Sequence, residues 1–329
     1  MTRALVARAP TRLDFGGGWT DVPPYPEREG GVVCSAAISR YATATVATHG
    51  HLGARTAGSH RGDDALVRAA LSRSRISGID AQLSSDYPVG AGLGGSSAAG
   101  VALSGALAAV ADAPLRPQAL AALSRDIETT ELGIAGGYQD HYAAAFGGAL
   151  LMHFDEGVSV EQLPLSERLQ HELAHRGILI YTGESRISGD TIVAVRDAYL
   201  AGESRVANAL ARMKSLALLM ADALRGEDVD ELGALVGEHW DAQRALHPSI
   251  TTARIDAIMS AAATAGALGA KALGASGGGC VLAIAEDGRE DELARALVPF
   301  GEQLTYAIDV TGFAVIASFE GTDQPFDGL

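Results

Sequence analysis

The sequence predicts a mixed α and β fold that is divided into two domains. A length of 329 residues suits one large or two ordinary domains with a sizeable core. Segments rich in Val, Ile, Tyr and Thr with partial alternation predict strands at Leu5–Phe15 and Gly31–Thr48. Apolar residues at helical spacing recur in both halves of the chain. We expect domains at 1–172 and 173–329, because a polar helical segment leads there into a new apolar strand.

The first half alternates strands and helices. The two long strands are separated by Pro23–Pro26, a stiff proline-rich loop. Two aspartates begin the segment Asp63–Ser74 and suit the N-terminal end of a helix dipole. The further elements expected are helices at Ala98–Ala111 and Leu115–Leu132 and strands at Ala81–Asp86 and Ala149–Phe154.

The second half is richer in helices. A strand is expected at Gly177–Tyr181, directly after a polar helix at Ser166–Arg176. The other expected helices are Gly189–Leu200, Ser204–Arg225, Val229–Leu246, Thr252–Ala265 and Glu290–Val298. The last expected strands are Cys280–Ala285, Gln303–Val310 and Gly312–Phe319.

The composition describes an acidic globular protein with a net charge of −15. An acidic surface argues against nucleic acid as a partner, because phosphate backbones require basic residues. Cys34 and Cys280 are too few for a disulfide framework, which favours a reducing compartment. No signal-peptide region and no membrane-spanning apolar run is present in the sequence. We expect a cytoplasmic protein without a membrane partner, and a homodimer is left open.

The segment Pro88–Gly100 is the strongest candidate for a phosphate-binding loop. Its glycines remove Cβ atoms at the start of a predicted helix, where unpaired N–H groups and the helix dipole favour an anion. The segment lacks the lysine of a P-loop and matches a dinucleotide-binding loop only loosely. A glycine turn without a ligand remains the alternative. The candidate residues are Pro88, Gly90, Ala91, Gly92, Leu93, Gly94, Gly95, Ser96 and Ser97.

A second candidate site lies at the end of the first strand, in residues 9–21. Arg12, Asp14, Trp19 and Asp21 place a cation, two carboxylates and an indole beside three glycines. Loops at the end of a rigid strand often bind ligands. The indole face of Trp19 could pack on a sugar, and Asp21 could accept hydrogen bonds from hydroxyls. A β-bulge with a core tryptophan is the alternative interpretation.

A third candidate combines Asp140, which follows the glycine turn Gly136–Gly137, with Glu128 on the preceding helix. A carboxylate beside a glycine turn suits a general base that removes a hydroxyl proton. Glu128 and Ser96 together offer the few oxygen ligands that Mg²⁺ takes when it also binds nucleotide phosphates. Taken alone, Glu128 is more typical of a charge on a helix surface.

Two further patterns have competing interpretations. The glycine cluster in residues 269–280 could line an active site or form a plain turn into a strand. His171–His175 matches the H-E-x-x-H pattern of zinc proteases. The predicted helix stops directly afterwards, and no third ligand is indicated. We therefore interpret the second match as a chance pattern on a solvated helix.

Together these segments resemble the GHMP kinases, the superfamily of galactokinase, homoserine kinase and mevalonate kinase. Three motifs in the family order span nearly the whole chain: residues 9–12 onward, 88–99 and 271–280, with Asp140 between the last two. The bacterial D-glycero-D-manno-heptose 7-phosphate kinases are the most similar group. That resemblance depends on residues 12–21, 136–148 and 181–186. Residues 17–21 lack the Glu and His of galactokinases, which argues against galactose.

The resemblance implies an α+β fold of two domains, ribosomal-protein-S5-like and then ferredoxin-like, with the site in the cleft between them. It implies ATP and Mg²⁺ as cofactors, Asp140 as catalytic base and Arg12 as the residue that stabilises the transferring phosphoryl group. Ser96 with Glu128 would support Mg²⁺, although Ser97 is an alternative to Ser96. The implied substrate-binding residues are Asp14, Gly17, Gly18, Trp19, Thr20, Asp21, Gly137, Asp140, Arg186, Lys271, Gly277 and Gly278.

These features predict an ATP-dependent kinase for the anomeric C1 hydroxyl of D-glycero-D-manno-heptose 7-phosphate. The substrate phosphate needs a cation, for which Arg186 and Lys271 are the candidates. An octose 8-phosphate of a lincosamide-type antibiotic pathway and free fucose are alternative substrates. A kinase-fold sensor without turnover and a zinc protease are the alternatives from other classes.

Overall fold

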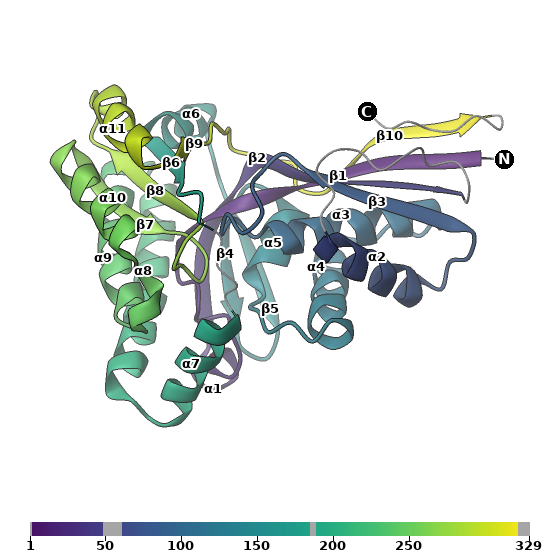
Figure 1. Cartoon of the computed structure of the whole chain (residues 1–329), viewed down its shortest axis with the longest axis horizontal. Helices are drawn as coiled ribbons and strands as arrows, with labels where there is room; N and C mark the ends of the chain where they lie inside the picture. The colour runs from purple at the N-terminus through teal and green to yellow at the C-terminus, as the bar shows by residue number, and fades with distance from the viewer. Residues whose placement is uncertain (1, 49–60, 185–188, 322–329) are drawn as a thin grey trace.

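The computed structural model describes residues 2–48, 61–184 and 189–321. The first part is built on a six-stranded antiparallel sheet in the order β10-β1-β2-β4-β5, with β3 paired to the outer end of β2. Figure 1 shows the sheet as a long ribbon with helices beneath it. Its strands are β1 (Thr2–Gly16), β2 (Gly31–Thr48), β3 (Ile79–Ser85), β4 (Ala149–Phe154), β5 (Val158–Leu163) and β10 (Ala314–Gly321).

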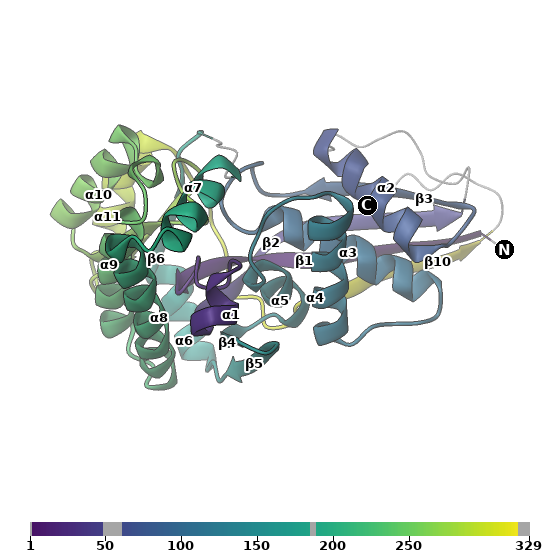
Figure 2. The same ribbon diagram turned by 90° about the horizontal axis from the view of Figure 1, so that it is seen from below.

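One face of this sheet is covered by helices. The buried helix α3 (Gly95–Val110) packs against β1 and β2, because its small residues allow the helix to approach the sheet closely. Figure 2 shows α3 flanked by its neighbours. The others are α2 (Arg61–Ser74), α4 (Pro117–Asp126) with the π-helical turn η1 (Ile127–Glu131), and α5 (Gln139–Phe146); α1 (Tyr25–Glu29) lies near the inner end of β2.

The second part contains a four-stranded antiparallel sheet in the order β7-β8-β6-β9. In chain order this is second, third, first and fourth, the ferredoxin-like arrangement that was predicted. Its strands are β6 (Gly177–Tyr181), β7 (Ala267–Ala272), β8 (Cys280–Ala285) and β9 (Glu302–Gln303). Its helices are α6 (Glu167–Arg176), α7 (Gly189–Leu200), α8 (Ser204–Arg225), α9 (Val229–Arg244), α10 (Ala253–Thr264) and α11 (Glu290–Leu297).

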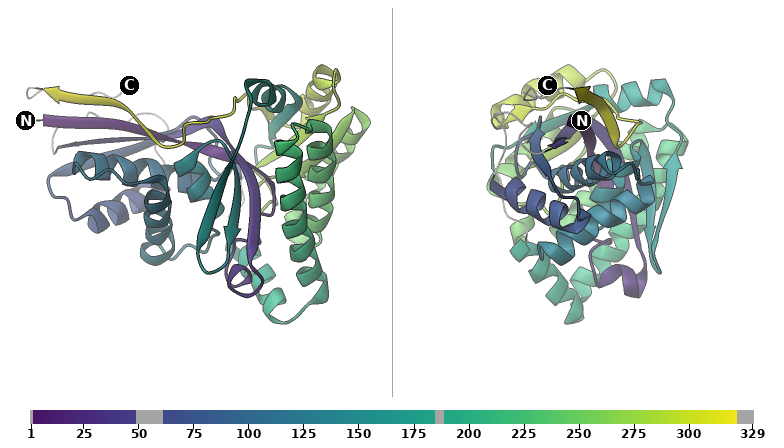
Figure 3. Two further views of the ribbon diagram at one scale, coloured as in Figure 1. Left: turned by 180° about the vertical axis from the view of Figure 1, so that it is seen from behind. Right: turned by 90° about the vertical axis from the view of Figure 1, so that its right-hand side faces the viewer.

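The two parts share a continuous core. One buried cluster combines Phe15 and Cys34 of the long strands with Met220 of α8, Leu235 of α9 and Leu282 of β8. Figure 3 shows α8 and α9 side by side next to the inner ends of these strands. The apolar contact fixes the position of the second part relative to the first. Both cysteines are free and buried.

The end of the chain returns to the first sheet. Strand β10 pairs antiparallel with β1, so the last strand lies beside the first (Figure 1). The division of the chain at residues 172 and 173 remains a prediction, but the last strand adds to the sheet of the first part. Among the described residues, no helix combines the length and apolar character needed to cross a membrane.

Several element predictions are corrected by the structure. The predicted strand Gln303–Val310 is wrong, because only its first residue lies in β9 and the rest connects the two sheets. Ile308 forms an isolated bridge to Ile38 within that connection. The predicted helix Leu115–Leu132 is shorter and changes to a π-helical turn at Ile127. The elements β5, β7 and α5 were not predicted, and the loop Pro23–Pro26 overlaps α1.

Candidate active site

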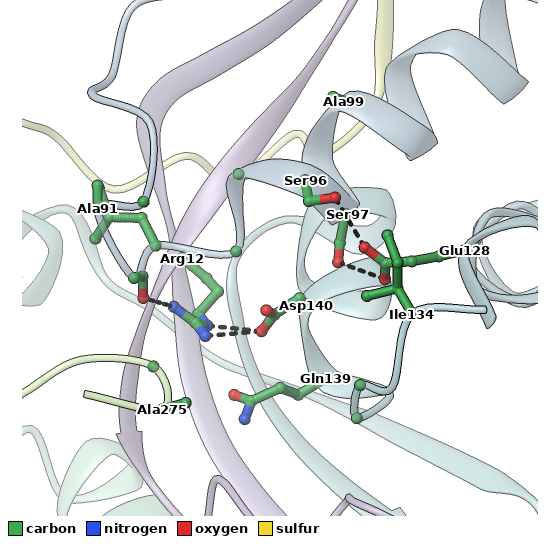
Figure 4. Close-up of a pocket in the computed structure, with 18 of the residues that line it drawn as sticks. Arg12, Ala91, Ser96, Ser97, Ala99, Glu128, Ile134, Gln139, Asp140 and Ala275 are labelled. Carbon is green, nitrogen blue, oxygen red and sulfur yellow. Dashed lines mark hydrogen bonds and ion pairs between the residues drawn. The ribbon is translucent and has the colours of Figure 1, made fainter. Parts of the chain in front are cut away.

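A cavity of about 520 Å³ lies between the two parts of the molecule. This volume falls within the range of small-molecule sites in proteins. Its lining comes from the end of β1 and the following turn, the segment between β3 and α3, the π-helical turn, the start of α5 and the loop after β7. Figure 4 shows side chains from these segments pointing toward one another. The candidate residues that were far apart in sequence therefore meet in one place.

The glycine loop forms one wall of this cavity, and each of its predicted residues, from Pro88 to Ser97, lines it. Gly90, Gly92 and Gly94 have φ between 73° and 75°, a conformation that side chains rarely adopt. A Cβ on Gly92 would lie 2.7 Å from the Leu273 carbonyl oxygen. The glycines thus allow a tightly folded loop whose backbone leads into the N-terminus of α3.

Asp140 and Arg12 form an ion pair below this loop. Arg12 Nε and Nη2 both lie 2.9 Å from Asp140 Oδ1, and Nη1 donates to the Gly92 carbonyl oxygen at 2.5 Å. Arg12 is almost fully buried, whereas the Asp140 side chain keeps 28% of its surface exposed. A Cβ on Gly94 would lie 2.9 Å from Asp140 Cγ. The glycine loop, the guanidinium and an accessible carboxylate are therefore in direct contact (Figure 4).

Glu128 points into the other end of the cavity from the π-helical turn. Ser96 Oγ donates to Glu128 Oε1 at 2.8 Å, and the Ser97 hydroxyl lies 3.5 Å from Oε2. Ser96 is exposed and Ser97 is buried, which favours Ser96 for contact with a ligand. Burial would raise the pKa of Glu128, but the hydrogen bond and the charge interaction with His141, together with hydrogen bonds from the two serines, outweigh burial and lower it. The side chain is thus an ionised carboxylate beside a hydroxyl.

The end of β1 and the turn that follows it contribute the buried carboxylates Asp14 and Asp21. Asp21 Oδ2 accepts hydrogen bonds from the backbone N–H groups of Tyr138 and Gln139 at 2.7 and 2.9 Å, and so caps the start of α5. Burial, reinforced by the charges of Asp140 and Asp14, raises the pKa of Asp21 to about 6. Within the described structure, four buried polar atoms of this region have no partner: Asp14 Oδ1, Trp19 Nε1, Asp21 Oδ1 and Gln139 Oε1.

A buried group of side chains supports this turn from the second part of the molecule. Lys271 Nζ lies 3.3 Å from Asp14 Oδ2 and donates to the Asp14 and Phe15 carbonyl oxygens. His239 Nε2 accepts from the Gly17 N–H at 2.9 Å. Although burial opposes its charge, the Lys271 cation with help from Arg12 lowers the pKa of Asp14. Burial lowers the pKa of His239 well below its usual value and so keeps the ring neutral.

Comparison with known proteins agrees with this geometry. The family model of the GHMP kinase N-terminal domain matches residues 64–148, and that of the GHMP kinase C-terminal domain matches residues 220–302. The chain belongs to the GHMP kinases. As a member of this family it is an ATP-dependent phosphotransferase, and the predicted family, fold class and enzyme class are confirmed.

Proteins that are similar to this GHMP kinase include heptose phosphate kinases. D-glycero-alpha-D-manno-heptose 7-phosphate kinase of Campylobacter jejuni is 27% identical over 90% of this chain and 93% of its own length. A crystal structure of a D-glycero-D-manno-heptose 1-phosphate kinase from Bacteroides thetaiotaomicron matches with a TM-score of 0.76 and 25% identity, covering 98% of this chain and all of the other. The bifunctional fucokinase/GDP-fucose pyrophosphorylase of Arabidopsis thaliana is 26% identical over 87% of this chain, and the match covers 30% of the length of the Arabidopsis protein.

Lys271 requires a correction as a substrate-binding residue of this kinase. Its side chain is fully buried and occupied by Asp14, so it cannot hold the phosphate of a substrate. Arg186, the other predicted cation, lies outside the described residues. Among the described residues that line the cavity, Arg12 is the only Lys or Arg.

The predicted substrate residues divide into lining and supporting groups. The cavity is lined by Asp14, Gly18, Trp19, Asp21, Gly137 and Asp140. Gly17, Thr20, Gly277 and Gly278 do not line it, and their role in substrate binding stays a prediction. The Thr20 hydroxyl donates to the Gly17 carbonyl oxygen at 2.7 Å and holds the turn. The last residue of the glycine cluster supports the loop from behind, because the Cys280 N–H donates to the Ala91 carbonyl oxygen at 2.8 Å.

Sequence reasoning missed several residues of the site. Gln139 lines the cavity directly beside Asp140, and Figure 4 shows its amide pointing inward. Its place next to the predicted base was a signal that could have found it. Leu66, Leu83 and Ile134 also line the cavity, but they come from three separate elements and no local pattern marks them.

The H-E-x-x-H match in this kinase lies away from the cavity. His171 and His175 lie one turn apart on exposed positions of α6, with ring centroids separated by 5.7 Å. The intervening Glu172 forms an ion pair with Arg168. Across the described residues, no three His, Cys, Asp or Glu side chains gather in a way that could hold a metal ion. This agrees with a chance pattern on a helix surface.

Proposed function

We propose that this kinase transfers a phosphoryl group from ATP to the anomeric C1 hydroxyl of D-glycero-D-manno-heptose 7-phosphate. The product would be the 1,7-bisphosphate. The observation that carries this proposal is the accessible Asp140 carboxylate, held by Arg12 between the glycine loop and the carboxylate-rich turn. The names of the Campylobacter and Bacteroides relatives support a heptose phosphate as the substrate class.

Asp140 would accept the proton of the C1 hydroxyl as the oxygen attacks the phosphoryl group. Arg12 contacts both Asp140 and the glycine loop, so its guanidinium lies where negative charge on the transferring group can be stabilised. Helix α3 directs its N-terminus toward the same place. The protein would thus act mainly by positioning the two substrates and by stabilising charge.

The Ser96 and Glu128 oxygens fit Mg²⁺. Mg²⁺ takes oxygen ligands, keeps several waters and commonly uses one or two protein groups with nucleotide phosphates. A hydroxyl and an ionised carboxylate 2.8 Å apart at the cavity wall form such a donor set. When bound, Mg²⁺ would neutralise charge on the nucleotide phosphates. Ser96 and Glu128 would then orient the nucleotide from the loop side.

The unpartnered atoms of the turn suit a polyhydroxylated substrate. Two carboxylate oxygens and the Gln139 Oε1 atom accept hydrogen bonds, and Trp19 Nε1 donates one. Sugar hydroxyls can complete these bonds, whereas a phosphate placed there would be repelled by Asp14 and Asp21. The sugar ring or chain would therefore occupy this end, and its distal phosphate would extend away from it.

A panel of phosphate acceptors with coupled detection of ADP tests this function. Heptose 7-phosphate is expected to have the highest kcat/KM, ahead of octose 8-phosphate and free fucose. A higher kcat/KM for fucose would transfer the assignment to a free sugar, in line with the Arabidopsis fucokinase relative.

Substitution of the proposed base separates a kinase from a sensor. Asp140→Asn should lower kcat about 10³-fold because it cannot accept the proton, while ATP and sugar binding stay within about threefold. Asp155→Asn removes an exposed carboxylate in the turn between β4 and β5 and should leave kcat unchanged. If wild type and Asp140→Asn both bind ATP and sugar phosphate and neither forms ADP, the protein is a sensor.

A further inference from the structure

Glu128 occupies an unusual position in the backbone. Helix α4 ends at Asp126, and the chain continues as the π-helical turn Ile127–Glu131. The Leu132 N–H donates to the Ile127 carbonyl oxygen at 3.2 Å, five residues back. Such π-helical turns are rare in proteins, and many of those that are found lie at functional sites. The wider turn sets the direction in which Glu128 leaves the helix.

A buried histidine holds the Glu128 carboxylate from behind. His141 Nε2 lies 2.8 Å from Glu128 Oε2, and His141 Nδ1 lies 3.0 Å from Ser124 Oγ. Both His141 and Ser124 keep about 1% of their surface exposed. The ring can bond both neighbours at once, because Nε2–H donates to Glu128 while Nδ1 bonds to Ser124 Oγ. One carboxylate oxygen is thus bound by His141, and the other faces Ser96.

The helices α3 and α5 leave space for Ser124 and place His141 beside Glu128. A Cβ on Gly100 of α3 would lie 2.5 Å from Ser124 Oγ, so the glycine leaves the space that the serine occupies. His141 follows Asp140 directly in α5. The same helical turn therefore carries the proposed base and the partner of Glu128, which fixes the two carboxylates relative to each other.

We propose that His141 and Ser124 are positioning residues that hold the Glu128 carboxylate toward Ser96 for binding of the nucleotide-bound metal ion. This inference rests on the proposed metal role of Glu128. Partners of metal-binding side chains commonly contribute 10–100-fold to metal affinity, because they fix the ligand's orientation. Neither His141 nor Ser124 lines the cavity, so their effect would pass through Glu128.

Binding of Mn²⁺ in the presence of ADP, measured by electron paramagnetic resonance, tests this role without turnover. His141→Leu is expected to weaken Mn²⁺ binding about 10–100-fold. His141→Gln can still donate to Glu128 and should recover most of the affinity, and Ser124→Ala should weaken it by a few fold. Binding of ADP alone in the presence of a chelator should stay within about threefold of wild type for all three variants. His153→Leu, a half-buried histidine on β4, is the matched control and should bind Mn²⁺ normally.

Glu128→Gln distinguishes failure of this inference from failure of the proposed metal role. Loss of Mn²⁺ binding in Glu128→Gln but not in His141→Leu or Ser124→Ala would overturn the positioning role alone. Wild-type binding in Glu128→Gln would overturn both. Thermal unfolding of each variant checks that it is folded. If His141→Leu is unfolded, His141→Gln and Ser124→Ala decide, and equal loss of metal-free ADP binding in them would show a merely structural role.

Discussion

The two walls of the cavity are built in different ways. The glycine loop, residues 88–97, contains no ionisable side chain and presents backbone groups, two hydroxyls and a helix N-terminus. The end of β1 and the turn after it present the buried carboxylates Asp14 and Asp21, and Lys271 and His239 support this wall from behind through Asp14 and Gly17. The first arrangement suits an anion and the second suits neutral hydroxyls. A wall for an anion depends on the conformation of the glycine backbone. A wall for hydroxyls depends on buried carboxylates, whose negative charge must be balanced by a buried cation such as Lys271.

The largest effect is expected from removing the compensating cation. Lys271→Met leaves the buried Asp14 carboxylate without its partner and should lower the free energy of unfolding by about 4 kcal/mol. Urea unfolding measures this. Lys214, the only other lysine, is half-buried and donates to the Glu29 carbonyl oxygen, so Lys214→Met should cost less than about 1 kcal/mol. Equal losses of unfolding free energy in Lys271→Met and Lys214→Met would contradict this expectation. The double variant Lys271→Met with Asp14→Asn should recover much of the lost stability, because it removes the unpaired carboxylate.

Asp21 predicts a pH dependence of stability. Because its folded pKa is raised from 3.8 to about 6, its contribution is fully present below about pH 4 and is lost as pH rises through 6. Asp21→Asn cannot ionise, so its stability relative to wild type should rise by up to about 3 kcal/mol between pH 4 and pH 7. Urea unfolding across this range measures the difference. If the difference in unfolding free energy between Asp21→Asn and wild type does not change with pH, the folded protein does not raise the pKa of Asp21.

The glycine loop should respond through its backbone. In Gly92→Ala the new Cβ meets the Leu273 carbonyl oxygen at a φ of 74°, which should cost about 2 kcal/mol of stability and weaken ATP binding about tenfold. Gly202 has a similar φ of 76° but open space around it, so Gly202→Ala should cost about 1 kcal/mol and leave ATP binding unchanged. Unfolding and calorimetric titration with ATP measure both. Equal ATP affinities would show that loop shape is unimportant.

The smallest effect is expected outside both walls. His171→Ala changes an exposed helix position and should alter stability by less than about 0.5 kcal/mol, with kinase activity unchanged. Elemental analysis of the purified protein should find no stoichiometric zinc. Zinc that is present at one equivalent and lost in His171→Ala would restore the protease alternative.

The sequence predicted one wall better than the other. The glycines of residues 88–97 stand in one continuous segment, and their spacing before a helix indicates their purpose without knowledge of the fold. Lys271 was misassigned because a lysine near a glycine cluster gives no sign of its burial. Its partner Asp14 lies more than 250 residues away in the sequence, and only the packing of β7 against the end of β1 brings them together. His141 lies only 13 residues from Glu128 and 17 from Ser124, and it was not recognised because only the packing of α5 against the end of α4 shows that its ring is buried between them.

Within single segments, local chemistry was sufficient. The strand β2 and the helices α7 and α8 begin and end where periodicity predicted, since each contains its own pattern of burial. The strand predicted at Gln303–Val310 failed because its residues bridge two sheets, and alternation alone does not reveal a missing partner strand.

The sequence by itself predicted the kind of reaction, because three motifs in the order of the GHMP kinases, with Asp140 between the last two, carry a resemblance that implies phosphoryl transfer. The tertiary structure alone decided which side-chain atoms of the site already have a hydrogen-bond or ion-pair partner. Asp21 uses one oxygen to cap α5, Glu128 shares one with His141, and Lys271 is buried against Asp14. These assignments depend on contacts between separate segments, within the first part for Asp21 and Glu128 and between the two parts for Lys271, and such contacts exist only after these segments have packed together.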